Sequence, residues 1–225
     1  MLIVLEGLDG AGKSTQVRML KEYLKERDGE LDYIHFPRYD GPVYGDLISR
    51  FLRGDFGSNE TVHPQLVALL FAEDRHGAVP EISRSLEAGK TVLLDRYVYS
   101  NIAYQCAKLS SDEEADQLRR WIFETEFNVF GEPRPDINIF LDVPIDFVES
   151  NLASNRAGDD RNYLGGAQDI HEASIDFQKR VKEMYLRQAA EDPSLKVVGC
   201  SDENGKMLPA EVIFEKIKAV VDGRA

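Results

Sequence analysis

Near the start of the chain, glycines, a lysine and a serine stand at a spacing that binds phosphate. The stretch from Gly7 to Ser14 has the pattern G-x-x-x-x-G-K-S, in which backbone N–H groups surround phosphate oxygens at a helix N-terminus. Lys13 can neutralise the terminal phosphates of a nucleoside triphosphate, and the Ser14 hydroxyl can bind Mg²⁺. A plain glycine-rich turn is the alternative, but a strand-like run precedes the motif and a helical pattern follows it. The residues expected to hold the triphosphate are Gly7, Leu8, Asp9, Gly10, Ala11, Gly12, Lys13, Ser14 and Thr15.

A second polar group follows the apolar run Thr91–Leu94. In a phosphate-loop protein, an acid at the end of a strand is the usual neighbour of Mg²⁺, and here that acid is Asp95. The adjacent Arg96 can hold a phosphate with paired hydrogen bonds, although a structural Asp–Arg pair would explain the same dipeptide. Another apolar run ends in a similar way, with Phe36, Pro37, Arg38 and Tyr39. An ordinary loop with an exposed arginine is the alternative for this second cluster.

Two helical stretches carry side chains suited to a nucleoside. Phe71 and Arg75 are four residues apart and share a helix face, so a ring could stack on a base while a guanidinium binds a carbonyl oxygen. A nearby face presents amides that could read a base edge and a ring that could pack against a sugar. The members of that face are Asn101, Tyr104 and Gln105, directly after Ser100. If the phosphate loop were absent, we would prefer to interpret Phe71 as a core residue and Arg75 as a surface residue. The second spacing is also explained, with no ligand, by an amphipathic helix that has a polar outer face.

The elements that must position these residues alternate between strands and helices. This alternation is typical of crossover connections, and predicts an α/β fold with a five-stranded parallel sheet between two helical layers. Ligands of such folds bind at the carboxyl ends of the strands, where the clusters above are expected. The predicted strands are Leu2–Leu5, Tyr33–Phe36, Thr91–Leu94, Ile137–Leu141 and Lys196–Val198. The predicted helices are Lys13–Lys25, Gly45–Leu52, His63–Leu86, Ser100–Lys108, Asp112–Phe127, Asp146–Asn155, Asp169–Asp192 and Pro209–Val221.

The composition narrows the class of protein. A formal net charge of −13 argues against a nucleic-acid partner, because binding a phosphate backbone requires a basic surface. Cys106 and Cys200 fit no disulfide or metal-binding pattern, so we expect a reducing, cytoplasmic location. No apolar run is long enough to cross a membrane, and we expect no membrane partner.

Taken together, the motifs resemble those of thymidylate kinases. The phosphate loop alone is generic, whereas the block Asp95–Gln105 combined with the Phe71/Arg75 helix is specific to this family among nucleotide kinases. The resemblance implies a three-layer α/β/α P-loop kinase fold and transfer of the γ-phosphoryl group of ATP to dTMP, with Mg²⁺. The matching stretches, in the family's order, are Glu6–Gln16, Phe36–Tyr39, Leu70–Arg75, Asp95–Gln105, Pro135–Asp142 and Leu208–Ile213.

The resemblance also implies roles for single side chains around dTMP. Phe71 would stack on thymine, Arg75 would bind its O4 atom, and Asn101 would contact the base edge. Tyr104 would pack beneath C2′ of the sugar, and Asp9 would bind the 3′-hydroxyl. The full set expected to contact dTMP is Asp9, Phe36, Pro37, Arg38, Tyr39, Phe71, Arg75, Arg96, Ser100, Asn101, Tyr104, Gln105, Tyr163 and Asp169.

The phosphate loop has no basic residue directly before Gly12. In this respect the chain resembles bacterial-type members of the family, whose catalytic arginine comes from a lid. The lid is expected at about residues 154–168, and both Arg156 and Arg161 are candidates. Arg38 and Arg96 look like clamps on the acceptor phosphate. The expected catalytic residues are Lys13, Asp95, Arg96, Arg156 and Arg161, and the expected metal ligands are Ser14 and Asp95.

We expect one nucleotide-kinase domain over residues 1–225. By resemblance we also expect a homodimer, with the helix His63–Leu86 at the interface. Two alternatives to a dTMP kinase stay open at this point. One is a related deoxynucleoside or nucleotide kinase with another acceptor, and the other is a nucleotide-dependent switch. A GTP-dependent switch would need the guanine-reading motif Asn-Lys-x-Asp, which the sequence lacks.

Overall fold

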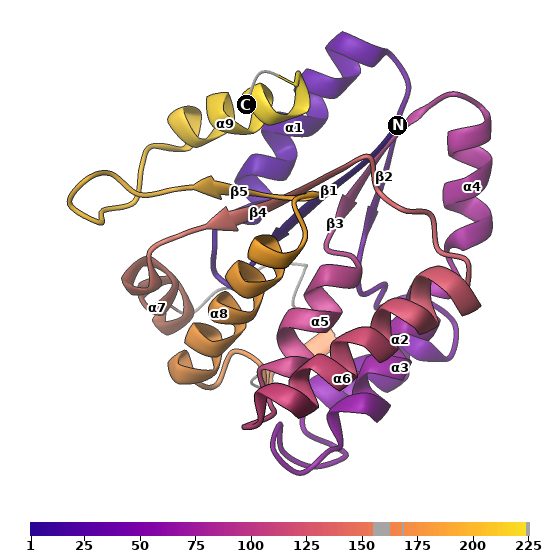
Figure 1. Ribbon diagram of the computed structural model, residues 1–225, viewed down its shortest axis with the longest axis vertical. Helices are drawn as coiled ribbons and strands as arrows, with labels where there is room; N and C mark the ends of the chain where they lie inside the picture. Colours follow the sequence, from indigo (N-terminus) through magenta and orange to yellow (C-terminus); the bar gives the residue numbers. More distant parts are fainter. Residues whose placement is uncertain (155–162, 168, 224–225) are drawn as a thin grey trace.

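The computed structural model describes residues 1–154, 163–167 and 169–223. Its sheet has five strands in the order β2-β3-β1-β4-β5, and every pair of neighbours is parallel. Because β1 is central, the loop that follows it opens at the middle of the sheet's carboxyl edge (Figure 1). The strands are β1 (Leu2–Gly7), β2 (Leu31–His35), β3 (Thr91–Asp95), β4 (Ile137–Asp142) and β5 (Leu195–Gly199).

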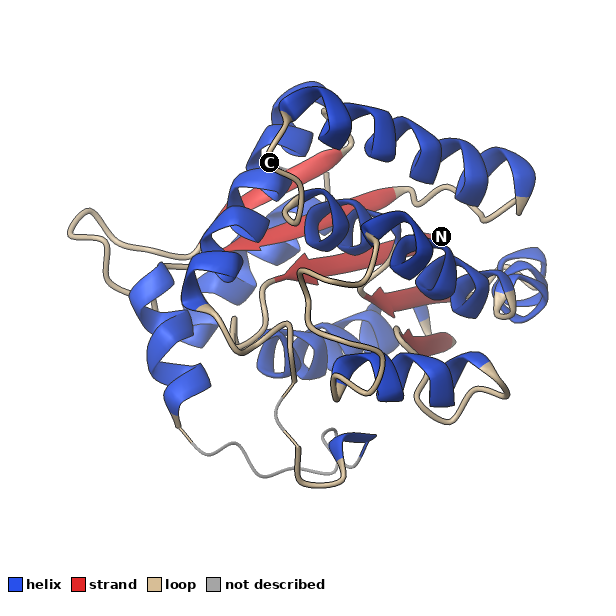
Figure 2. Cartoon of the chain, turned by 90° about the horizontal axis from the view of Figure 1, so that it is seen from below, coloured by secondary structure: helices blue, strands red, loops and turns tan. Residues whose placement is uncertain are grey.

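Helices cover both faces of this sheet, as predicted (Figure 2). On one face α1 packs beside α9, and on the other α5 packs beside α8. The α-helices are α1 (Lys13–Asp28), α2 (Tyr44–Leu52), α3 (Pro64–His76), α4 (Val79–Glu87), α5 (Val98–Cys106), α6 (Asp112–Phe123), α7 (Ile145–Ala153), α8 (Ile175–Glu191) and α9 (Ala210–Val221). A π-helix, η1 (Glu124–Val129), continues α6.

The predicted single helix His63–Leu86 is wrong, because the structure divides it into α3 and α4. Helix α3 ends at His76, and its cap is Gly77. Pro80 then stands in the first turn of α4, a position where its missing N–H and fixed φ do no harm, whereas a continuing helix would lose a hydrogen bond there. Pro80, which interrupts the apolar periodic pattern, was therefore the sequence signal for the boundary between α3 and α4.

Two other helix predictions are wrong at one end. The stretch Asp112–Phe127 changes from α-helix to the wider π-helix after Phe123, and hydrophobic spacing does not reveal that change. The helix expected from Asp169 begins at Ile175, because the Ser174 hydroxyl accepts the N–H of Phe177 and caps the helix there. The residues before Ser174 are therefore loop, which brings them to the site described below.

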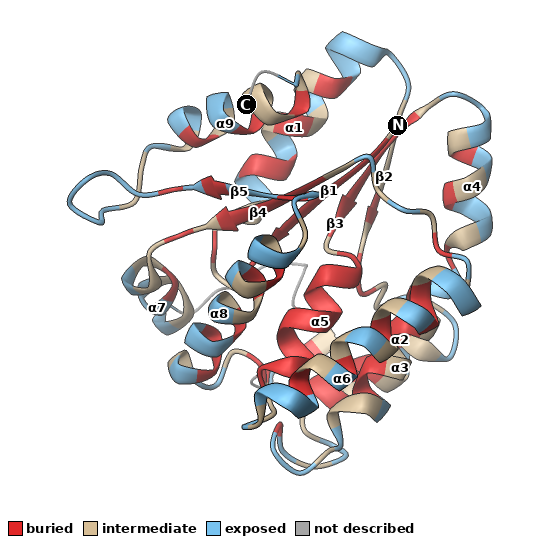
Figure 3. Ribbon diagram, viewed as in Figure 1, coloured by how far each residue is buried: buried red, intermediate tan, exposed pale blue. Residues whose placement is uncertain are grey.

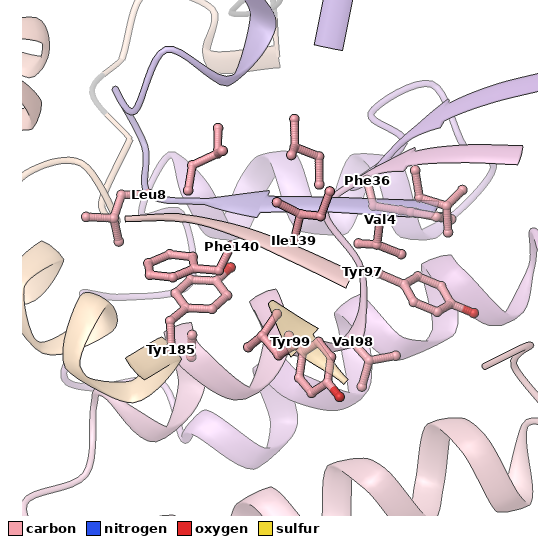
Figure 4. Close-up of a cluster of buried hydrophobic side chains, with 14 of the residues drawn as sticks. Val4, Leu8, Phe36, Tyr97, Val98, Tyr99, Ile139, Phe140 and Tyr185 are labelled. Carbon is pink, nitrogen blue, oxygen red and sulfur yellow. The ribbon is translucent and has the colours of Figure 1, made fainter. Parts of the chain in front are cut away.

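The core lies on both faces of the central strands. All residues of β1 are buried, and α5 is buried along its whole length (Figure 3). The ring of Phe140 in β4 stacks on Tyr185 in α8, with 4.3 Å between the ring centroids (Figure 4). These contacts hold β1, β4, α5 and α8 as one unit, and that unit supports the side chains of the site.

No helix in the described ranges is both long and apolar enough to cross a membrane. The prediction of a single domain with a lid at residues 154–168 stays a prediction, since residues 155–162 and 168 lie outside the described part of the chain.

Candidate functional site

The phosphate loop connects β1 to α1 and needs glycine at two positions. Gly10 and Gly12 both have φ of 75°, a left-handed conformation that residues with a Cβ rarely adopt. Helix α7 holds the loop from one side, because Asn151 Nδ2 donates a hydrogen bond to the Gly10 carbonyl oxygen at 2.7 Å. The loop and Asn151 both line a cavity of about 1070 Å³, so the loop is held by α7 at the cavity wall.

The residues expected to hold a triphosphate do not all reach this cavity. Residues 9–14 line it, whereas Gly7, Leu8 and Thr15 do not. Leu8 is fully buried in the core, so its side chain anchors the loop instead of facing a ligand.

Lys13 and Asp95 face each other across the loop. Lys13 Nζ lies 3.9 Å from Asp95 Oδ1, which is too long for a hydrogen bond. Among the described residues, Oδ1 is buried without a hydrogen-bond partner, and such an oxygen is unfavourable unless a cation or donor meets it. Burial and the charge of Arg96 lower the pKa of Lys13, while nearby acids act in the opposite direction.

An oxygen-ligated cation fits this corner of the site. Asp95 offers the unpartnered carboxylate oxygen just described, and Ser14 offers a hydroxyl at the start of α1. No cluster of three or more acidic, His or Cys side chains that could hold a metal occurs in the described part of the chain. Mg²⁺ usually takes one or two protein oxygens together with water and substrate phosphates, so Ser14 and Asp95 could hold it.

Asp9 is tied to three other elements of the fold. Its carboxylate accepts hydrogen bonds from Arg96 Nη2 at 2.7 Å, from the Tyr104 hydroxyl at 2.8 Å and from Gln178 Nε2 at 3.2 Å. Burial would raise the pKa of Asp9, but the charges of Arg96 and Lys13 and the Tyr104 hydroxyl hold that pKa at about 2. Asp9 is therefore a carboxylate at neutral pH, and it orients Arg96.

Arg96 has an unusual backbone, with φ of 69°. For a residue with a long side chain this region is strained, and such strain is concentrated at functional sites. The guanidinium lies over the Tyr104 ring, 5.1 Å from its centroid, and Nη1 donates to Ser100 Oγ at 3.2 Å. These contacts point Arg96 along the carboxyl edge of the sheet.

A buried carboxylate beneath Arg96 was missed as a site residue. Glu6 accepts hydrogen bonds from the Ser100 hydroxyl, from the Tyr185 hydroxyl at 2.9 Å and from the Tyr97 N–H at 3.0 Å. Burial raises the pKa of Glu6, and these three donors oppose that change. The sequence feature that could have identified Glu6 is its position, as an acidic residue inside an apolar strand directly before the phosphate loop. Glu6 links β1, α5 and α8 under the reacting end of the site.

A second, smaller cavity lies beside the first. Every residue predicted to contact dTMP lines it, apart from Arg38. Its lining also contains Leu52 and His171, which sequence reasoning did not assign. The two cavities share Asp9, Pro37, Tyr39, Arg96 and Tyr163, so they meet at the phosphate loop.

Arg38 is turned away from both cavities. Its Nε donates to Asp74 Oδ1 at 3.0 Å, and its guanidinium also reaches the Asp74 carbonyl oxygen. The Arg38 N–H donates to Asp74 Oδ2 at 2.9 Å, and Asp74 is buried. The predicted role on the acceptor phosphate would require Arg38 to leave this ion pair. Spacing along the chain does not show that α3 supplies a buried carboxylate here.

His171 lines the second cavity and contacts four aromatic rings, those of Phe51, Phe71, Tyr104 and Phe177. Its ring lies 6.4 Å from the Phe71 centroid at an interplanar angle of 21°, and 5.2 Å from that of Tyr104. Burial holds the pKa of His171 well below its ordinary value, so the ring is neutral. In the described ranges its Nε2 atom has no hydrogen-bond partner. The predicted helix from Asp169 hid this residue, because it implied that residue 171 was helical.

Two tyrosines stack where the cavities join. The rings of Tyr39 and Tyr163 are 3.8 Å apart and nearly parallel, and the Tyr163 hydroxyl donates to Asp169 Oδ2 at 2.6 Å. Burial and the charge of Asp9 raise the pKa of Asp169 to about 7. The predicted lid arginines, Arg156 and Arg161, lie outside the described residues.

Comparison with known proteins bears on this arrangement. The sequence model of the thymidylate kinase family matches residues 5–207. A thymidylate kinase of Mycobacterium tuberculosis is 35% identical over 192 residues, which cover 85% of this chain and 86% of that protein. A probable thymidylate kinase of Thermococcus kodakarensis is 32% identical, with coverage of 99% and 97%. The solved thymidylate kinase of Candida albicans has a TM-score of 0.69 and 28% identity, with coverage of 99% and 92%. This chain belongs to the thymidylate kinase family.

Proposed function

We propose that the enzyme binds ATP in the first cavity and dTMP in the second, and transfers the γ-phosphoryl group where the two cavities meet. As a thymidylate kinase, the chain is a phosphotransferase that forms dTDP from dTMP. The observation that carries the placement is the shared wall, in which Asp9 and Arg96 line both cavities. This shared wall suits a reaction between two bound nucleotides better than the turnover of one nucleotide by a switch.

The reaction needs little proton chemistry. The attacking atom is an oxygen of a phosphate that is already anionic, so the site must mainly align two phosphates and neutralise charge. Lys13 is placed to neutralise the transferred group, and Arg96 to hold the acceptor phosphate. Mg²⁺, if held by Ser14 and Asp95, would supply further positive charge beside the phosphates.

The second cavity supplies the contacts for the nucleoside. Phe71 presents a ring for thymine to stack on, and Tyr104 closes the space beneath the sugar. Asp9 can accept a hydrogen bond from the 3′-hydroxyl, because its charge persists at neutral pH. These roles rest on the family resemblance together with the lining of the cavity.

A lid arginine completes the proposed machinery. The phosphate loop places Ala11 and Gly12 before Lys13, so it supplies no second cation of its own. The substitutions Arg156→Ala and Arg161→Ala test the two candidates, and one of them should lower kcat about tenfold or more. If neither does so, the lid-arginine proposal is wrong.

A homodimer in a reducing, cytoplasmic compartment completes the proposal. Leu66 on α3 is 66% exposed, which suits a surface that a second copy would cover. Cys106 and Cys200 are buried, free thiols, as expected where disulfides do not form. Sedimentation of the wild-type chain beside Leu66→Glu tests the dimer; a wild-type monomer would contradict it.

The direct test is an assay for the formation of dTDP from dTMP and ATP, run with and without a metal chelator. Anion-exchange chromatography measures the dTDP that is formed. We expect dTDP only when Mg²⁺ is present. A preparation that forms no dTDP would contradict the activity, and equal yields with the chelator would contradict the metal.

A further inference from the structure

One buried carboxylate, that of Glu126, contacts two of the polar side chains that line the second cavity, Arg75 and Asn101. Glu126 accepts Arg75 Nε at 2.5 Å and Arg75 Nη2 at 2.9 Å. The same carboxylate accepts Asn101 Nδ2 at 2.8 Å. Arg75 and Asn101 line the cavity, whereas Glu126 does not. Glu126 therefore lies one layer behind the residues that a base would touch.

The paired hydrogen bonds fix how Arg75 presents its guanidinium. Nε and Nη2 are both used by Glu126, which fixes the plane of the group. In the described part of the chain, no hydrogen bond is formed by Nη1, and that nitrogen carries donors only. Arg75 therefore offers the cavity a hydrogen-bond donor in a fixed direction.

The same carboxylate decides which end of the Asn101 amide faces the cavity. Asn101 Nδ2 donates to the Ala68 carbonyl oxygen at 2.9 Å as well as to Glu126. Both partners accept hydrogen bonds only, so the amide nitrogen must point toward them. Asn101 Oδ1 is left buried and without a partner among the described residues. Because Asn101 lines the cavity beside Arg75, Oδ1 is the atom of this amide that can accept a hydrogen bond from a bound base.

We infer that Glu126 is a positioning residue that sets the donor and acceptor pattern with which this kinase distinguishes thymine from cytosine. The inference rests on the proposed placement of dTMP in the second cavity. The N3–H and O4 groups of thymine offer a donor beside an acceptor, which complements Asn101 Oδ1 and Arg75. Cytosine offers the reverse pattern, and would leave buried polar groups unpaired.

The neighbouring Glu132 provides a matched control. It is as buried as Glu126, and its Oε2 lies 3.9 Å from Arg75 Nε, but it makes no contact with Asn101. Burial and the adjacent charge of Glu126 raise the pKa of Glu132 far above its ordinary value, which favours its protonated form. In a Glu126→Gln variant, Glu132 can lose its proton and balance the charge of Arg75.

The test compares Glu126→Gln and Glu132→Gln with the wild-type enzyme, using kcat/KM for dTMP and for dCMP. A glutamine at 126 must place an NH₂ group against a donor of Arg75 or Asn101, so one of them is displaced. We expect the dTMP-to-dCMP ratio to fall about tenfold or more in Glu126→Gln. The ratio should stay within about twofold of wild type in Glu132→Gln, and the KM for ATP should be unchanged in both.

A second substitution separates positioning from loss of folding. If Glu126→Gln is unfolded at the assay temperature, Glu126→Asp takes its place in the test. This variant keeps the negative charge on a side chain that is one methylene shorter, and it should also lower the dTMP-to-dCMP ratio. In an Asn101→Ala background, the change at 126 should lower the ratio less than it does in wild type, because one of its two targets is gone. A folded Glu126→Gln enzyme with the wild-type ratio would overturn the inference. A wild-type enzyme that does not prefer dTMP to dCMP would instead contradict the placement of dTMP.

Discussion

The phosphate end and the base end of the site are built in different ways. At the phosphate end, one short loop and the ends of adjacent strands bring together Lys13, Asp95 and Arg96. At the base end, Arg75 depends on Glu126, which comes from a π-helix about 50 residues further along the chain. Phosphate binding relies largely on backbone shape, which a local motif encodes. Base reading relies on side-chain direction, which distant partners determine.

The two ends also differ in charge. Lys13 lies 3.9 Å from its nearest acid, so much of its charge remains available to phosphate. Arg75 is neutralised by a bidentate ion pair with Glu126, so in the proposed placement it would meet an uncharged base as a hydrogen-bond donor. In the proposed placement, one cation would therefore bind an anion, and the other would read a carbonyl oxygen. The following substitutions probe that contrast, from the largest expected effect to the smallest.

The largest effect is expected at the phosphate end. Lys13→Ala removes the charge nearest the transferred group and should lower kcat about 10²- to 10³-fold. Because Lys13 does not line the second cavity, the Kd for dTMP, measured by calorimetry, should change little. Lys196→Ala, at an exposed position of β5 that lines neither cavity, is the control and should be nearly as active as wild type. A Lys13→Ala enzyme with wild-type kcat would contradict the contrast.

At the base end, Phe71→Ala should weaken binding more than it slows the reaction. The lost stacking surface should weaken dTMP binding by about 1–3 kcal/mol. Phe71→Leu keeps apolar contact without a flat ring, and should lie between wild type and alanine. Titration of each variant with dTMP measures the effect. If the Kd for dTMP were unchanged in Phe71→Ala, the proposed placement of thymine in this cavity would be wrong.

Asp9 stands between the two ends, and its charge should appear in the acid stability of the protein. The pKa of Asp9 is about 2 in the folded chain, against 3.8 for an ordinary Asp. Since the folded value is the lower one, the stabilisation is present above about pH 4 and is lost as the pH falls toward 2. Asp9→Asn should thus lower the free energy of unfolding at neutral pH by about 2 kcal/mol.

Urea unfolding at several pH values between about 2 and 6 measures this difference, which should shrink as the solution becomes more acidic. Glu183→Gln is the control, because Glu183 is exposed on α8, and it should leave this pH dependence unchanged. A penalty for Asp9→Asn that is equal at every pH would show that the charge of Asp9 is not responsible.

The smallest effect is expected where the cavities join. Tyr163→Phe removes the hydrogen bond to Asp169 but keeps the stack on Tyr39. The loss of one buried hydrogen bond should weaken dTMP binding by about 1 kcal/mol. Tyr39→Leu removes the stack instead and serves for comparison. A much larger loss in Tyr163→Phe would mean that the hydroxyl contacts the substrate itself.

The same contrast explains what the sequence could predict. The alternation of strands and helices predicted the sheet and its helical layers, because each pattern depends on residues close in sequence. The cavity-lining side chains at Phe71 and Asn101 were found from their helical spacing. Glu126 and His171 were not, since their roles follow from the π-helix and from the loop before α8. Likewise, the side-chain direction of Arg38 depends on Asp74, a partner that spacing does not reveal.

The most direct test of the account is the acceptor preference of the wild-type enzyme. Steady-state assays with ATP should compare dTMP, thymidine, dUMP, dCMP and a purine monophosphate under one set of conditions. The account predicts the highest kcat/KM for dTMP, because the phosphate meets Arg96 while the base meets Phe71 and Arg75. A preference of about tenfold or more for thymidine or the purine monophosphate would contradict it.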